Sequence, residues 1–121
     1  MKPKLNVLAV ITLLLSFSVS AADIAGTWTA SFDSQVGKQE YTYMFEVNGM
    51  DVSGTITSSL GPATMAEGKL DGDTLTFTEN LSYQDMPLQI KYVGTVSGNE
   101  IRFVRDVAGF AKEEVTAMRA E

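Results

Sequence analysis

The chain has 121 residues, carries a formal net charge of −6 at pH 7, and contains neither histidine nor cysteine. These absences exclude disulfides, remove the usual ligands of zinc, haem and iron–sulfur sites, and exclude Ser-His-Asp and Cys-His catalysis. The acidic balance also disfavours nucleic acid and anionic lipid as partners. We therefore expect no metal and no cofactor, and any chemistry must use carboxylates, tyrosines, lysines, arginines or hydroxyls.

The N-terminal residues have the composition of an export signal. Lys2 and Lys4 precede an apolar run over 5–19, and small residues follow it, which suits cleavage after Ala21 or Ala22. The run is shorter than the ~20 residues that a membrane-spanning helix needs. We expect a cleaved signal peptide over 1–21, a secreted or periplasmic product with no remaining membrane span, and a single domain over 22–121.

After the signal, apolar and polar residues alternate in short runs, which is the pattern of half-buried antiparallel strands. In chain order, eight strands are expected at Ile24–Phe32, Gln39–Val47, Asp51–Thr57, Ala63–Leu70, Thr74–Leu81, Leu88–Val96, Glu100–Asp106 and Glu113–Arg119. We find no internal repeat and no low-complexity segment.

The connections between these runs contain turn residues. Asn48-Gly49 is a strong hairpin signal, and Gly72 and Gly98 sit in two further polar turns. The segment from Ser82 to Pro87 is expected to be a longer connection. Because every strand is followed by its neighbour, the predicted fold class is all-β, an eight-stranded antiparallel up-and-down meander that closes into a barrel.

Alternation also assigns side chains to the two faces of each strand. In the second strand it places Tyr41, Tyr43, Phe45 and Val47 inward, and in the fifth it places Thr78 outward. Two charged residues share the inward register of their strands with leucine, isoleucine and phenylalanine. They are Glu79 and Arg105. A buried charge is costly without a partner, so each requires one.

Two interpretations of this pair stay open. Glu79 and Arg105 either pair with each other or with tyrosine hydroxyls as a structural plug, or they line a cavity and contact a ligand. Inward tyrosines and phenylalanines beside them give a mixed aromatic and polar lining that suits an amphipathic molecule. The candidate ligand-binding residues are Arg105, Glu79, Tyr41, Tyr43, Tyr92, Phe77 and Phe103.

Gly26-Thr27-Trp28 on the first strand, with Arg119 on the last, resembles the pattern of lipocalin-like and avidin-like (calycin-type) barrels. The resemblance implies that Trp28 closes one end of the barrel and that Arg119 packs across it, both in structural roles. With a single Trp, the chain departs from the Trp-lined biotin pocket of avidins. Stretches 37–41 and 101–105 resemble, more loosely, small secreted bacterial barrels of unassigned role found near carbohydrate-degrading enzymes.

Three functions follow as hypotheses. The leading one is an exported barrel that holds a small amphipathic or carbohydrate-like molecule in its interior. The second is an accessory or interaction module associated with carbohydrate-active enzymes, which would use its outer surface. The third is a small isomerase, cyclase or hydrolase that uses Glu79 and a tyrosine, although a non-enzymatic role is favoured. A cavity beside Glu79 and Arg105 would favour the first, and a filled interior the second.

Overall fold

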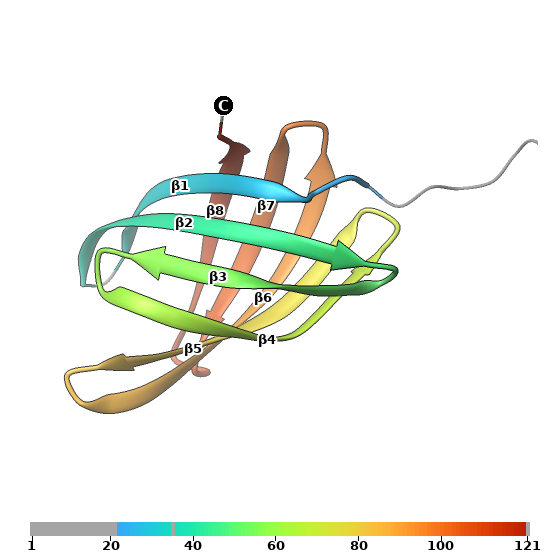
Figure 1. Cartoon of the computed structure of the whole chain (residues 1–121). Coiled ribbons are helices and arrows are strands. Elements are labelled where there is room, and N and C mark those ends of the chain that lie inside the picture. Colours follow the sequence, from blue (N-terminus) through green and yellow to red (C-terminus); the bar gives the residue numbers. More distant parts are fainter. Residues whose placement is uncertain (1–21, 35, 121) are drawn as a thin grey trace, which may run out of the picture.

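The structure, a computed structural model, describes residues 22–34 and 36–120. Eight antiparallel strands follow one another around a closed barrel, so the predicted fold class is confirmed (Figure 1). The strands are β1 (Gly26–Ser34), β2 (Gly37–Asn48), β3 (Asp51–Ser58), β4 (Gly61–Asp71), β5 (Thr74–Tyr83), β6 (Met86–Ser97), β7 (Glu100–Val107) and β8 (Ala111–Arg119). The expected signal peptide over 1–21 lies outside the described residues.

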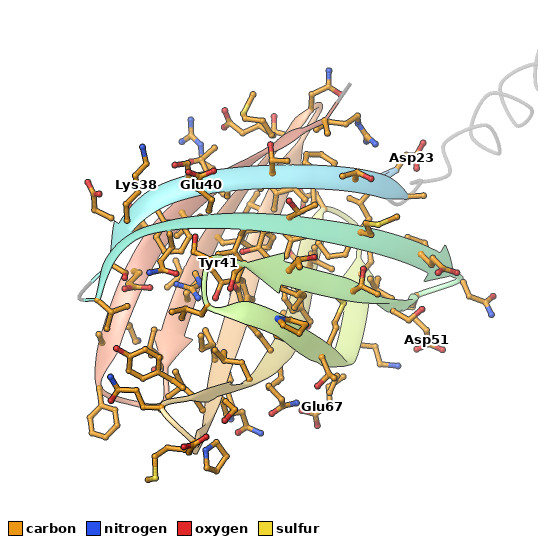
Figure 2. The ribbon with its side chains drawn as sticks, turned by 60° about the vertical axis from the view of Figure 1, so that its left-hand side comes forward. Asp23, Lys38, Glu40, Tyr41, Asp51 and Glu67 are labelled. Carbon is orange, nitrogen blue, oxygen red and sulfur yellow. The ribbon has the colours of Figure 1, made fainter. Side chains whose placement is uncertain are left out.

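The alternation of the sequence becomes the inside and outside of the barrel. In β2 every second side chain from Gln39 to Phe45 is buried, and those between them are exposed or half-buried. Figure 2 shows Tyr41 inside the barrel, whereas Glu40 lies on its outer side. An interior eight strands wide is filled by such inward side chains, and this rule places most of the core directly from the sequence.

Two side chains depart from the expected alternation. Val47 was expected inward but is 37% exposed, because the β1–β2 pairing ends at Gly26 and Phe45 and β1 does not flank Val47 beside the β2–β3 turn. Thr78 was expected outward but is buried. Its partner strand β4 has a register shift after Ala66, where Glu67 has a positive φ of 58°, and the Glu67 carboxylate accepts a hydrogen bond from Thr78. A β-bulge bends the strand that contains it, and the bulge in β4 brings Glu67 over Thr78.

The turns fall into two groups at opposite ends of the barrel. The end that carries Trp28, which we call the tryptophan end, has the β2–β3, β4–β5 and β6–β7 turns, each with a glycine at positive φ: Gly49, Gly72 and Gly98. The other end, which we call the cavity end, has the β1–β2, β3–β4, β5–β6 and β7–β8 turns.

The expected long connection from Ser82 to Pro87 is wrong. Tyr83 pairs with Met86 and Ser82 with Pro87, so β5 and β6 continue into a two-residue turn at Gln84 and Asp85. Both turn residues have positive φ, the backbone that such tight hairpins require. The sequence lacks the glycine that usually marks this turn, and the signal was therefore missed. Figure 1 shows this hairpin extending beyond the neighbouring strands.

The barrel closes between β1 and β8 near the tryptophan end. Trp28 pairs with Arg119 and Thr29 with Met118, and among the described residues these two pairs make up the β1–β8 ladder. Beyond Thr29 the two strands separate, and a groove lined by Ser31, Thr116 and other residues runs between them. The closure is therefore strongest at the tryptophan end and looser toward the cavity end.

Candidate functional site

The polar cluster inside the barrel is built on one cross-strand row. Tyr92 of β6 pairs with Arg105 of β7, which pairs with Glu113 of β8. All three side chains point inward, and directly opposed residues of neighbouring strands are close enough to interact. Arg105 donates from Nε to the Tyr92 hydroxyl at 2.8 Å and from Nη1 to the Glu113 carboxylate. The register thus sets the guanidinium between a phenol and a carboxylate.

Glu79 completes the cluster from β5. Its two carboxylate oxygens accept hydrogen bonds from the hydroxyls of Tyr41, at 2.8 Å, and Tyr92, at 2.6 Å. Arg105 Nη2 donates to the Tyr41 hydroxyl at 2.9 Å and lies 3.6 Å from Glu79 Oε1. Glu79 and Arg105 are therefore paired, largely through two tyrosine hydroxyls that each accept from one and donate to the other.

Tyr43 extends the same network. Its hydroxyl lies 3.0 Å from that of Tyr92. Because the Tyr92 proton is directed at Glu79, Tyr43 is the donor in this pair when Glu79 is ionised. The hydroxyls of Tyr43 and Tyr92 and the Glu79 carboxylate then all have partners, so this part of the cluster offers little to a further molecule.

Burial controls the protonation of these groups. The Glu79 side chain is fully buried, and this raises the pKa of the carboxyl above its ordinary value, although hydrogen bonds from Tyr92 and Tyr41 and the charge of Arg105 act in the opposite direction. Burial likewise raises the pKa of Tyr41, Tyr43 and Tyr92, so these phenols stay neutral well above pH 10. Arg105 is the one cation among two carboxylates and three neutral phenols.

A cavity of about 220 Å³ opens above this cluster at the cavity end. Its polar lining includes Tyr41, Arg105 and Glu113, together with Ser34, Gln39 and Tyr83. Its walls are otherwise largely apolar and include Leu60, Leu88, Ile90, Val107 and Phe110. Phe110 lies in the β7–β8 turn and is 86% exposed, an unusual position for so large an apolar side chain. A small apolar cavity with a few polar groups is the usual form of a ligand site.

Among the buried side-chain nitrogen and oxygen atoms of the described residues, Gln39 Oε1 in the cavity wall is the one without a hydrogen-bond partner. The Gln39 side chain is only 4% exposed. An unpaired buried carbonyl costs about 1–3 kcal/mol of stability, and native proteins keep few of them. The cavity wall therefore contains an acceptor that residues 22–34 and 36–120 leave unpaired.

The seven expected ligand-binding residues separate into two groups. Arg105 and Tyr41 line the cavity. The remaining five are not among the lining residues and are packed in the barrel interior: Glu79, Tyr43, Tyr92, Phe77 and Phe103. Phe77 stacks on Tyr92 with ring centroids 4.3 Å apart, and Phe103 meets both rings edge-on. Gly94 makes room for Phe103, because a Cβ there would lie 2.6 Å from its ring.

Sequence reasoning missed two residues of the site, Gln39 and Glu113. Both lie in the inward register of their strands, two positions before Tyr41 and Val115 respectively. This two-residue spacing from a buried side chain was the signal that could have assigned both residues to the barrel interior. It was passed over because both residues stand at the margins of the expected strands, where a polar side chain is usually solvated.

Trp28 and Arg119 lie at the opposite end of the barrel from the cavity. The Arg119 guanidinium lies 4.5 Å from the Trp28 ring centroid and donates to the carbonyl oxygens of Asp23 and Ala25. The indole Nε1 donates to Ile24 O at 2.9 Å. The side-chain hydrogen bonds of this pair go to the N-terminal segment and to Asn99 in the β6–β7 turn, as in a structural closure.

Two further searches concern the described part of the chain. Within residues 22–34 and 36–120, no group of three acidic side chains could hold a metal ion. No helix in that part is long and apolar enough to cross a membrane.

Comparison of the chain with protein-family models, with curated proteins and with solved structures finds no match. The function therefore has to be argued from the site.

Proposed function

We propose that this protein is a binding barrel that holds a small amphipathic molecule in the cavity at its cavity end. The observation that carries the proposal is Gln39, a buried amide with an unused carbonyl on the wall of an apolar cavity. Keeping an unsatisfied group in a core costs stability, which is reasonable where a ligand supplies the missing partner. Arg105 and Tyr41 support it as a fixed polar floor, since the cluster beneath holds both in place.

The apolar part of the ligand would contact Leu60, Leu88 and Val107, with Phe110 over it at the mouth. Its volume must be modest, because about 220 Å³ lies below the roughly 300–1,000 Å³ of most small-molecule sites. Glu79 is shielded from the cavity by its partners, so binding is a better-supported role than carboxylate catalysis.

The proposal is tested by filling the cavity. Val107 lines the cavity, whereas Val104 on the same strand faces outward and is exposed. We expect wild-type protein recovered from its own host compartment to retain a small molecule in native mass spectrometry. We expect Val104→Trp to retain it and Val107→Trp to lose it while keeping the β-sheet circular dichroism spectrum. Equal retention by the two variants would place the molecule elsewhere, and ligand-free wild-type protein would count against the proposal.

The resemblance to calycin-type barrels supports the same proposal. Gly26, Trp28 and Arg119, the three residues of the resemblance, meet at the tryptophan end, where Gly26 lies beside the Arg119 guanidinium. The resemblance implies that Trp28 closes this end, which leaves the cavity end for a ligand. Lys2, Lys4 and the apolar run over 5–19 support export, and N-terminal sequencing of the exported protein should begin at Ala22 or Asp23.

The accessory-module alternative is favoured by one feature of the outer wall. Val93 and Val104 are cross-strand neighbours on β6 and β7, and both are exposed. Replacing both with lysine would abolish docking to an enzyme partner under this alternative and leave ligand retention unchanged under the binding proposal. A pull-down of the enzyme partner with the wild-type protein and with the double variant separates the two functions.

A further inference from the structure

The charges around the cavity restrict what it can bind. Arg105 is held between two carboxylates, Glu79 at 3.6 Å and Glu113, which it contacts directly. Glu113 itself lines the cavity beside Arg105. An anionic ligand would therefore meet a carboxylate next to a guanidinium that is already neutralised, in a protein of net charge −6. Such a site gains little from a second anion and has to desolvate it.

A cation is disfavoured by the same arrangement. Glu113 is the nearest acceptor for an ammonium group, but it is occupied by Arg105. An ammonium beside it would lie close to the guanidinium and lose its hydration in an apolar cavity. Neither sign of charge finds an unpaired counterpart among the residues that line the cavity, so a neutral ligand is left.

Gln39 indicates which neutral group is needed. Its Oε1 atom is an acceptor without a partner in the described part of the chain, so the complementary ligand group is a donor, O–H or N–H. The nearby Ser34 hydroxyl, also on the cavity wall, already donates to Gly37 O at 2.9 Å and so does not serve this role. The ligand has to bring the donor.

From these three observations we infer that the ligand is an uncharged alcohol or amide, with a compact apolar body in the cavity and its donor on Gln39. The inference rests on the proposed binding function and names its ligand class. The apolar body lies among Leu60, Leu88 and Val107, and the head group points to the Gln39, Arg105 and Glu113 side of the cavity.

The test is a series of ligands that share a cyclohexyl ring bearing one carbon substituent and differ in the head group on that carbon. NMR titration of the full-length mature protein at pH 7 would give dissociation constants for cyclohexylmethanol, cyclohexanecarboxamide, cyclohexanecarboxylate, cyclohexylmethylammonium and the methyl ether of the alcohol. We expect the alcohol and amide to bind more tightly than either charged compound by at least about tenfold. We expect them to exceed the ether, which lacks the donor, by about fivefold.

Gln39→Met removes the acceptor and keeps a side chain of similar length. The alcohol and the ether should then bind equally well. Gln89→Met is the matched control, because Gln89 is exposed on β6 and bonds to Asn80 outside the barrel. It should preserve the fivefold preference for the alcohol.

The outcomes are distinguishable. A carboxylate or ammonium compound that binds most tightly overturns the inference and leaves the binding function standing. An alcohol preference that survives Gln39→Met overturns the assignment to Gln39. If no compound shifts any resonance of the cavity residues and the protein from its host carries no molecule, the binding function itself fails.

Discussion

The two ends of the barrel differ in how completely they satisfy their polar groups. At the tryptophan end, the indole of Trp28 has its acceptor and Arg119 donates to Asn99 and to two backbone carbonyls. At the cavity end, Gln39 Oε1 is buried without a partner among the described residues. A saturated cluster stabilises a fold, whereas an unsaturated one beside a cavity is available to another molecule.

The backbone shows the same contrast. The three turns at the tryptophan end have a glycine at positive φ, where glycine carries no steric cost. The cavity end also has glycines at positive φ, namely Gly37, Gly61 and Gly109, but there Gln84, Asp85 and Ala108 adopt positive φ with side chains present. This costs roughly 1–2 kcal/mol per residue, and strain of this kind concentrates at functional sites.

The largest expected effect is at the tryptophan end. Trp28→Ala removes a fully buried indole, its hydrogen bond and the surface on which Arg119 lies, and should lower the free energy of unfolding by about 3–5 kcal/mol. Phe110→Ala is the matched aromatic deletion at the cavity end, where the side chain is exposed, and should change it by less than about 0.5 kcal/mol. Urea denaturation measures both, and equal losses would remove the distinction between the ends.

The Glu79 cluster lies between the ends and should give a pH-dependent signature. Because the folded pKa of Glu79 is raised, the folded protein holds its proton more tightly than the unfolded chain. Stability contributed by this proton is present at low pH and is lost as pH rises from about 4.3 through the folded pKa. The unfolding free energy of wild type minus that of Glu79→Gln should therefore fall with pH, by at most about 1.4 kcal/mol per pH unit. A difference that is constant from pH 4 to 8 would contradict the raised pKa.

Removing the unsatisfied group should stabilise the cavity end. Gln39→Met replaces an unpaired carbonyl by an apolar chain and is expected to raise the free energy of unfolding by about 1–2 kcal/mol in the absence of ligand. Glu40→Met changes the neighbouring outward side chain and should be close to neutral. Thermal denaturation of the ligand-free proteins provides the comparison, and destabilisation by Gln39→Met would show that Gln39 has a structural role.

The smallest effect concerns the strained turns. Ala108→Gly relieves a φ of 50° in the β7–β8 turn and should stabilise the protein by about 0.5–1 kcal/mol. Gly98→Ala is the reverse change at the tryptophan end, where φ is 61° and a Cβ would meet no atom within 4 Å, so its cost of about 1 kcal/mol is purely conformational. Opposite signs in chemical denaturation would support the contrast, and the same sign for both would contradict it.

The sequence by itself determined the strands and the side of the sheet on which most residues lie. Alternation around Tyr41, Glu79 and Arg105 is a local property, because successive side chains of a strand point to opposite faces whatever the strand pairs with. Glycine turns such as Asn48-Gly49 are local as well, and they ordered the strands as a meander that closes into a barrel. The turn at Gln84 and Asp85 escaped prediction because its residues lack that signal.

Only the tertiary structure decided how far along the barrel each inward side chain lies and what it meets across the interior. Tyr41 and Tyr43 are equivalent in the sequence pattern, yet Tyr41 lines the cavity and Tyr43 is packed among aromatic rings. Glu113 reaches Arg105 through the β7–β8 register, and Gln39, which pairs with Phe32, has no partner for its Oε1 atom among the described residues. These contacts depend on the pairing register and on the closure of the barrel between distant strands. The alternation of side chains within one strand does not encode either.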